Sequence, residues 1–116
     1  MTNVTIYHNP SCSKSRQTLA LLEEQGIEPQ VIEYLQEPPT PAQLQEILVK
    51  LKMTPRNLIR KNEAVFKEKQ LDDSHLSDAQ LIELMCRYPK LIQRPIVIVG
   101  KKAVLGRPPE NVLRIL

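Results

Sequence analysis

The chain has 116 residues, 41% of them hydrophobic and 25% charged, with a formal net charge of +3 at pH 7. This length fits one domain with a modest core, and no apolar run approaches the roughly 18 residues that a membrane-spanning helix needs. The N-terminus lacks the charged and apolar regions of a signal peptide, so we expect a cytoplasmic protein that does not contact membranes. Aromatic residues make up only 3% of the chain, which argues against a surface that stacks nucleic-acid bases.

The first expected strand covers residues 4–7, and the polar turn His8-Asn9-Pro10-Ser11-Cys12-Ser13-Lys14-Ser15 follows it. The apolar pattern is helical from Arg16 to Gln25, and Gly26 is typical of the position just after a helix. Cys12 is therefore expected at or just before the first helical turn. Unpaired N–H groups and the helix dipole favour a thiolate there and also bind anions. This combination suggests nucleophilic attack on an oxyanion or a disulfide.

The middle of the chain reads as a second strand followed by helices. Residues 30–35 form the strand, and the helix before it predicts a right-handed βαβ unit with parallel pairing. Helices are then expected after Thr40, Thr54 and Ser77. Each of these residues is a typical N-cap, with a proline directly after it or a glutamine three positions later. One or two further helical turns are expected within residues 63–70.

The last part of the chain returns to strands. Residues 95–99 are an apolar, β-branched run that predicts a buried strand. Gly100-Lys101-Lys102 predicts a hairpin turn, 103–105 the returning strand, and 110–116 a closing helix. The order β-α-β, several helices, then β-β-α predicts an α/β, thioredoxin-like fold with a mixed sheet. We expect a single domain, residues 1–116, with a helical insertion at about 40–90 between the two halves.

The two cysteines have different surroundings. There is no Cys-x-x-Cys pair and no cluster at zinc spacing, so no metal site is expected and both thiols are expected to stay free. Cys12 lies in a polar loop, which favours a reactive thiol. Cys86 follows Leu84 and Met85 on an amphipathic helix, which favours a structural role.

Ser15 and His8 are candidates for adjusting the reactivity of Cys12. The Ser15 hydroxyl, three residues after Cys12, can donate to its sulfur, or Ser15 can be an ordinary helix residue. Thioredoxin-type sites carry a second cysteine at that place, so an external thiol should complete any redox cycle here. His8 could stabilise the thiolate or shuttle a proton, or could be a satisfied polar residue at a strand end.

Three arginines stand next to backbone breakers: Arg60 ends a short helix, Arg94 precedes Pro95, and Arg107 precedes Pro108. Thioredoxin-like folds typically have a cis proline at the position of Pro95, facing the active cysteine. Guanidinium groups bind two oxygens of an oxyanion at once. Three arginines that converge on Cys12 would define an oxyanion pocket, whereas the alternative for each is a solvated surface position.

The chain closely resembles the ArsC family, the arsenate reductases that depend on glutathione and glutaredoxin. The resemblance covers almost the whole chain, and it includes Ile6-Tyr7-His8-Asn9-Pro10, Cys12 with Ser15-Arg16, Arg60-Lys61-Asn62, Arg94-Pro95-Ile96-Val97 and Arg107-Pro108. It implies that Cys12 is the nucleophile, that the three arginines bind the oxyanion, and that His8 and Ser15 tune Cys12. It also implies a thiol-arsenate intermediate, glutathione as co-substrate, glutaredoxin as partner, and no bound metal or organic cofactor.

Two departures point to a shorter branch of that family. The chain stops at Leu116, right after the last expected helix, where the best-known members carry a further C-terminal stretch. Residues 13 and 14 are Ser-Lys, where those enzymes usually have an uncharged pair.

Three other functions compete with this one. The low-molecular-weight phosphatase loop Cys-x5-Arg is excluded because Thr18 stands six positions after Cys12. A glutathione-dependent thiol oxidoreductase would need Cys12 without the three arginines together. An Spx-like regulator that binds RNA polymerase generally has a Cys-x-x-Cys switch, which Ser15 removes. A monomer is expected, since no exposed apolar stripe is left after the core is built.

Overall fold

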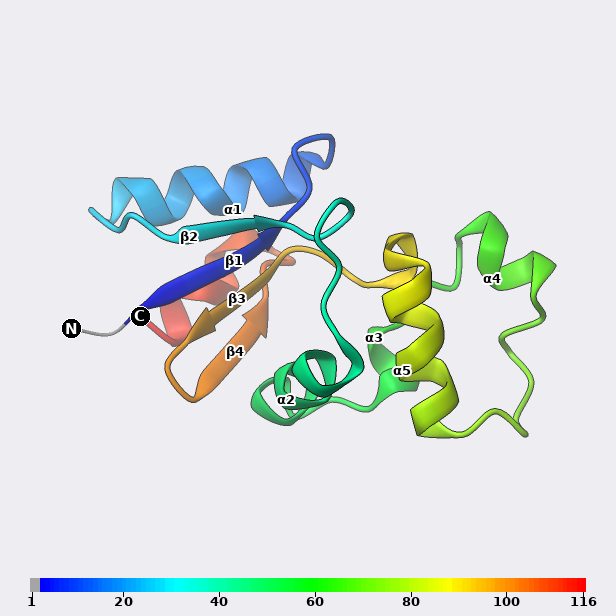
Figure 1. Ribbon diagram of the computed structural model, residues 1–116. Coiled ribbons are helices and arrows are strands. Elements are labelled where there is room, and N and C mark those ends of the chain that lie inside the picture. The colour runs from blue at the N-terminus through cyan, green and yellow to red at the C-terminus, as the bar shows by residue number, and fades with distance from the viewer. Residues whose placement is uncertain (1–2) are drawn as a thin grey trace. The chain divides into compact units, whose positions relative to one another are not determined.

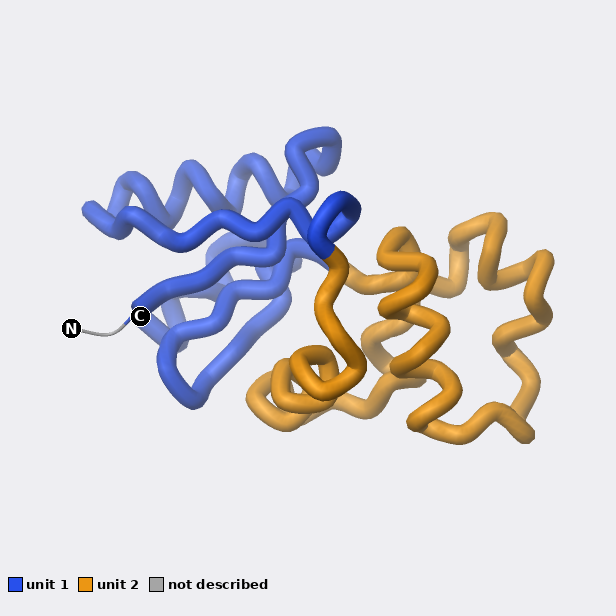
Figure 2. The backbone as a smooth tube through the Cα atoms, viewed as in Figure 1, with its two compact units in different colours: residues 1–37, 94–116 blue, residues 38–93 orange. Residues whose placement is uncertain are grey.

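The computed structural model describes residues 3–116 (Figure 1). The chain forms two compact units, shown in different colours in Figure 2. The first unit contains the N-terminal part as far as Glu37 together with Arg94–Leu116, and the second contains Pro38–Gln93. The second unit occupies the stretch in which the sequence predicts a helical insertion, and the grouping of residues 1–116 as one domain stays a prediction.

A four-stranded mixed sheet forms the centre of the first unit (Figure 1). Its strands are β1 (Val4–His8), β2 (Gln30–Glu33), β3 (Ile96–Val99) and β4 (Lys102–Leu105), in the spatial order β2-β1-β3-β4. β1 pairs in parallel with β2 and antiparallel with β3, and β3 and β4 form an antiparallel hairpin. The α/β architecture predicted from the order of elements is therefore confirmed.

Two helical elements cover one face of this sheet. α1 (Ser13–Glu24) and the 3-10 helix η2 (Pro109–Arg114) pack against each other. They contribute Leu22 and Val112 to a fully buried cluster with Ile6 of β1 and Val97 of β3. Ile6 and Val97 are register partners on neighbouring strands, so their side chains point to the same face.

Several boundaries in the first unit differ from the prediction. The strands shift by one or two residues, and β2 ends at Glu33 rather than at residue 35. α1 begins at Ser13 rather than Arg16, so the polar residues 13–15 belong to the helix. The closing segment is a 3-10 helix over residues 109–114 instead of an α-helix over 110–116. Short stretches commonly adopt the 3-10 form, and Pro109, at the first position of this one, has no N–H to donate.

The second unit is helical. It comprises α2 (Pro41–Leu51), α3 (Pro55–Leu58), α4 (Ala64–Glu68), α5 (Asp78–Arg87) and the 3-10 helix η1 (Pro89–Leu91). The predicted starts after Thr40, Thr54 and Ser77 are confirmed, and each of these three hydroxyls accepts a backbone N–H of the first turn. Among the described residues, no helix is long and apolar enough to cross a membrane.

Gly106 allows α1 and the loop after β4 to approach closely. A Cβ atom at this position would lie 2.5 Å from Oγ1 of Thr18 and 2.8 Å from Cγ of Pro95. The Gly106 N–H donates to the Pro95 carbonyl at 2.9 Å, and the Thr18 hydroxyl lies 3.3 Å from the Gly106 carbonyl oxygen. The residue that precedes Arg107 therefore has no room for a side chain.

We expect Gly106→Ala to lower the free energy of unfolding by about 1–3 kcal/mol, the usual effect of an overpacked site. Urea denaturation measures this change. Gly26→Ala is the comparison, because a Cβ there meets nothing within 4 Å and the only penalty comes from its φ of +76°. The loss at Gly106 should shrink in a Thr18→Ala background, and an equal loss in both backgrounds would contradict the steric explanation.

Candidate functional site

The turn between β1 and α1 is held by its own polar groups. The Asn9 side-chain oxygen accepts the Ser11 N–H at 3.0 Å, and the Asn9 carbonyl accepts the Cys12 N–H at 3.0 Å. Nη1 of Arg16 donates to the Pro10 carbonyl at 2.8 Å. These bonds place Cys12 as the N-cap of α1, with an extended backbone at φ −97° and ψ 121°.

The surroundings of Cys12 favour its thiolate form. Partial burial alone would raise the pKa of the thiol, but the backbone N–H groups of Ser15 and Lys14 and the guanidinium of Arg94 lower it further than burial raises it. The resulting pKa is below that of an ordinary cysteine. This direction agrees with the one predicted from the position at a helix N-terminus.

Ser15 contacts Cys12 through its backbone rather than through its hydroxyl. The side chain is fully buried, and its Oγ lies 2.6 Å from Nδ1 of His8 and accepts the Asn9 N–H at 3.0 Å. The predicted hydroxyl bond to the Cys12 sulfur is therefore replaced by a bond from the Ser15 N–H. The hydroxyl instead connects the end of β1 to the start of α1.

His8 is a neutral group in this structure at pH 7. Burial lowers its pKa, Glu33 partly opposes that effect, and Arg16 lowers it further. A neutral imidazole supplies no net positive charge to a thiolate. His8 contacts the Ser15 hydroxyl, and its role toward Cys12 stays a prediction.

Arg94 and Arg107 both reach Cys12. The Arg94 guanidinium forms a hydrogen bond with the Cys12 sulfur, and Nη1 of Arg107 lies 4.0 Å from that sulfur and 3.4 Å from the Arg94 carbonyl oxygen. Each arginine precedes a cis proline, Pro95 or Pro108, and the cis bond expected at Pro95 is confirmed. The first unit thus places two guanidinium groups and the α1 N-terminus around one thiolate, an arrangement suited to a small oxyanion.

Arg60, the third arginine of the predicted pocket, belongs to the second unit. Its Nη1 forms an ion pair with Oε1 of Glu63 at 2.8 Å and lies 3.3 Å from the Lys90 carbonyl oxygen. An oxyanion that binds Arg60 would have to share this guanidinium with Glu63. The role of Arg60 in substrate binding stays a prediction.

The second cysteine has the opposite electrostatic character. Partial burial, together with the negative charge of Glu83, raises the pKa of Cys86 to about 11. Cys86 is therefore a neutral thiol at pH 7, with little nucleophilic character.

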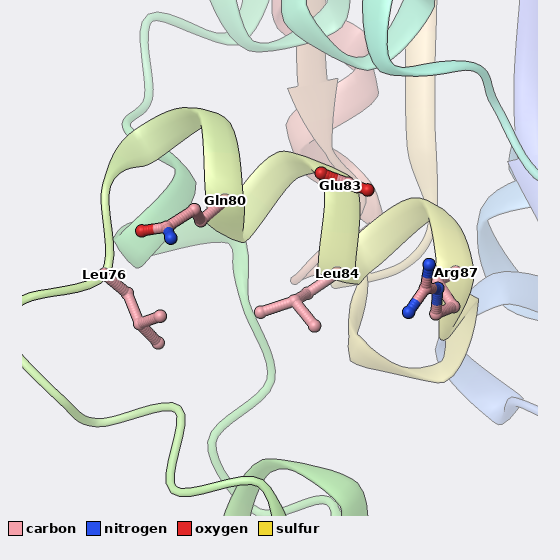
Figure 3. A pocket seen from close by; sticks show the side chains of 5 residues that line it. All are labelled: Leu76, Gln80, Glu83, Leu84 and Arg87. Atoms are coloured by element: carbon pink, nitrogen blue, oxygen red, sulfur yellow. The ribbon is translucent and has the colours of Figure 1, made fainter.

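Pockets in the second unit do not contain this chemistry. One pocket of about 240 Å³ on α5 is lined by Leu76, Gln80, Glu83, Leu84 and Arg87 (Figure 3). It contains no nucleophile, and its lining mixes apolar side chains with one acid and one base. Within residues 3–116, no group of three or more His, Cys, Asp or Glu side chains could hold a metal ion. The chemically distinctive site is the surface around Cys12.

Sequence reasoning missed two residues that shape this site. The Thr18 hydroxyl donates at 2.8 Å to the Lys14 carbonyl and also faces Gly106, and Asn111 contacts the loop of Arg107. Thr18 stands four positions before Leu22 on the buried face of α1, and this helical spacing is the sequence signal that could have identified it. Asn111 stands between Glu110 and Val112 and carries no sequence signal.

Comparison with known proteins gives consistent results. The ArsC family model matches residues 7–115. The chain is 52% identical to the uncharacterized protein YfgD of Escherichia coli K12, covering 97% of this chain and 96% of that protein. It is 49% identical to an arsenate reductase of Haemophilus influenzae, covering 98% and 99% respectively. A solved structure, the arsenate reductase from Vibrio cholerae, superposes with a TM-score of 0.97 at 52% identity, covering 99% of this chain and 98% of that one.

We expect the alkylation rate of Cys12 by iodoacetamide to rise with pH at a midpoint below about 8.5, the value of a free thiol, because the Ser15 and Lys14 N–H groups and Arg94 favour the thiolate. Mass spectrometry of the modified peptides separates the two cysteines. Cys86, with its pKa of about 11, is the internal control and should react slowly throughout. A Cys12 midpoint at or above 8.5 would rule out an activated thiol.

We expect protonation of His8 to destabilise the protein. Its pKa is lowered in the folded state from the ordinary 6.5, so the unfolded chain binds the proton more tightly, and stability falls as pH drops from 6.5 through the lower folded pKa. Urea denaturation at several pH values measures the slope. His8→Gln should flatten the slope in this range, and an unchanged slope would show that other groups cause it.

Proposed function

The chain belongs to the ArsC family, and we propose that it reduces arsenate to arsenite with Cys12 as the nucleophile. The observation that carries this proposal is the convergence of Arg94, Arg107 and the α1 N-terminus on a cysteine with a lowered pKa. Its 49% identity to an arsenate reductase over nearly the whole of both chains supports the choice of oxyanion.

The first chemical step in this proposal is attack by the Cys12 sulfur on arsenic. A sulfur–arsenic bond forms and one arsenic–oxygen bond breaks, giving a thiol-arsenate ester. The arsenate hydroxyl leaves as hydroxide and becomes water by taking a proton from the solvent. Arg94 and Arg107 neutralise the oxygens and hold the arsenic in line with the sulfur. Arg60 is the third proposed oxygen ligand, and His8 and Ser15 hold the turn in which Cys12 lies.

External thiols then supply the two electrons. Glutathione replaces a second arsenic oxygen as water, and a glutaredoxin thiolate attacks the glutathione sulfur. The disulfide between glutaredoxin and glutathione forms as the bond between arsenic and the glutathione sulfur breaks. The electron pair of that broken bond stays on arsenic, which becomes As(III). Hydrolysis of the Cys12–arsenic bond releases arsenite and the free thiol.

The local residues support an external route. Ser15 occupies the position of a resolving cysteine, and Cys86 is held as a neutral thiol. We therefore include glutathione as co-substrate and glutaredoxin as partner in the proposal, with no bound cofactor. A monomer in the cytoplasm, where thiols are kept reduced, completes it.

The test is arsenate-dependent NADPH oxidation with glutathione, glutaredoxin and glutathione reductase. Cys12→Ser should reduce activity to background, and Arg94→Ala or Arg107→Ala should lower kcat/KM by about 100-fold or more, the usual effect of losing one donor to the developing charge. The matched controls are Cys86→Ser and Arg114→Ala, which remove a cysteine and an exposed arginine outside the site. Both should retain wild-type activity.

Other outcomes would favour the alternatives. The wild-type protein could fail to turn over arsenate while Cys12 is readily glutathionylated and the protein reduces protein or small disulfides with glutathione. In that case it is a thiol oxidoreductase. If it instead co-purifies with RNA polymerase in a manner that depends on the redox state of Cys12, it is a regulator. Either result would overturn the arsenate proposal.

A further inference from the structure

Asn111, on η2, contacts the backbone on both sides of Gly106. Its Nδ2 donates to the Leu105 carbonyl at 3.2 Å and to the Arg107 carbonyl at 3.1 Å. A primary amide has two N–H bonds and can satisfy both acceptors at once. The amide can adopt only this orientation, because a flip would place the Asn111 side-chain oxygen against the two carbonyl oxygens.

The same three residues are held from their other side. Gly106 donates its N–H to the Pro95 carbonyl, and its own carbonyl faces the Thr18 hydroxyl. The backbone of Leu105, Gly106 and Arg107 is thus fixed by α1 and Pro95 on one side and by Asn111 on the other. The Arg107 side chain starts from this segment and is itself solvent-exposed, so the backbone contacts determine where its guanidinium can reach.

We propose that Asn111 is a positioning residue for Arg107. By holding the carbonyls on both sides of Gly106, it directs the Arg107 guanidinium toward the Cys12 sulfur and the Arg94 carbonyl. Asn111 itself has no contact with the reacting atoms in this assignment. The part of the role that concerns arsenate binding rests on the proposed function, whereas the placement of a positive charge beside Cys12 does not.

The experiment compares alkylation of Cys12 by anionic iodoacetate and by neutral iodoacetamide at one pH. The rate with iodoacetate divided by the rate with iodoacetamide reports the positive potential at the sulfur. A change in the pKa of the thiol affects both rates equally and therefore drops out of this ratio. Arg107→Ala should lower this ratio by about fivefold, the factor for one unit charge about 4 Å away in water. Asn111→Ala should lower it by about two- to fourfold, because the charge remains but moves away.

A double substitution separates positioning from general stabilisation. In an Arg107→Ala background, Asn111→Ala should not change the ratio further, since Asn111 acts through Arg107. Leu113→Ala is the matched control, an exposed neutral residue on the same 3-10 helix, and should leave the ratio at the wild-type value. If Asn111→Ala fails to fold, Asn111→Gln, which keeps the amide on a longer side chain, should give an intermediate ratio.

Three results would overturn the inference. The ratio could stay unchanged in a folded Asn111 variant, Asn111→Ala could act equally in the absence of Arg107, or Arg107→Ala itself could have no effect.

In the arsenate assay, Asn111→Ala should raise KM more than it lowers kcat. Absence of arsenate turnover by the wild-type protein would refute the proposed function while the alkylation ratio still decides the role of Asn111.

Discussion

The close contact between Gly106, Thr18 and Pro95 is the constraint on which the site depends. Cys12 lies on the turn before α1, whereas Arg94 and Arg107 lie next to the ends of β3 and β4, more than 80 positions away in sequence. At Gly106 these segments meet without room for a methyl group, since a Cβ there would lie 2.5 Å from Oγ1 of Thr18. Tight packing at this point brings an arginine backbone near enough for its side chain to reach the sulfur.

The groups that favour the thiolate are backbone dipoles and an arginine. Backbone N–H groups of Ser15 and Lys14 and the guanidinium of Arg94 oppose the effect of burial on Cys12, and an arginine stays charged at all physiological pH values. His8 is held neutral by burial and is joined to Ser15. Two tasks are therefore divided between different groups. The backbone N–H groups and Arg94 supply the positive potential at the Cys12 sulfur, and His8 holds the geometry of the turn through Ser15.

Sequence was sufficient for the parts of the fold that depend on local patterns. The strands, the capped starts at Thr40 and Ser77, and the place of Cys12 follow from alternation, capping residues and helix-start signals within a few positions. The partner of the Ser15 hydroxyl and the 3-10 form of η2 are not set by such patterns. The place of Arg94 follows from the fold, because the cis proline after it faces the active cysteine in thioredoxin-like folds. The contact of Arg107 with Cys12 could be expected only from family resemblance, because no local pattern encodes a contact across 95 positions.

The different sequence separations around Cys12 have a consequence for folding. The N–H cradle comes from residues within three positions of the cysteine and can form as soon as the first turn of α1 exists, whereas the Arg107 contact joins residues 95 apart. Local contacts form earlier and survive partial opening better than distant ones. We therefore expect a partly folded chain that has this turn but lacks the Arg107 contact to keep part of the lowered pKa of Cys12 without the positive charge of Arg107 beside the sulfur.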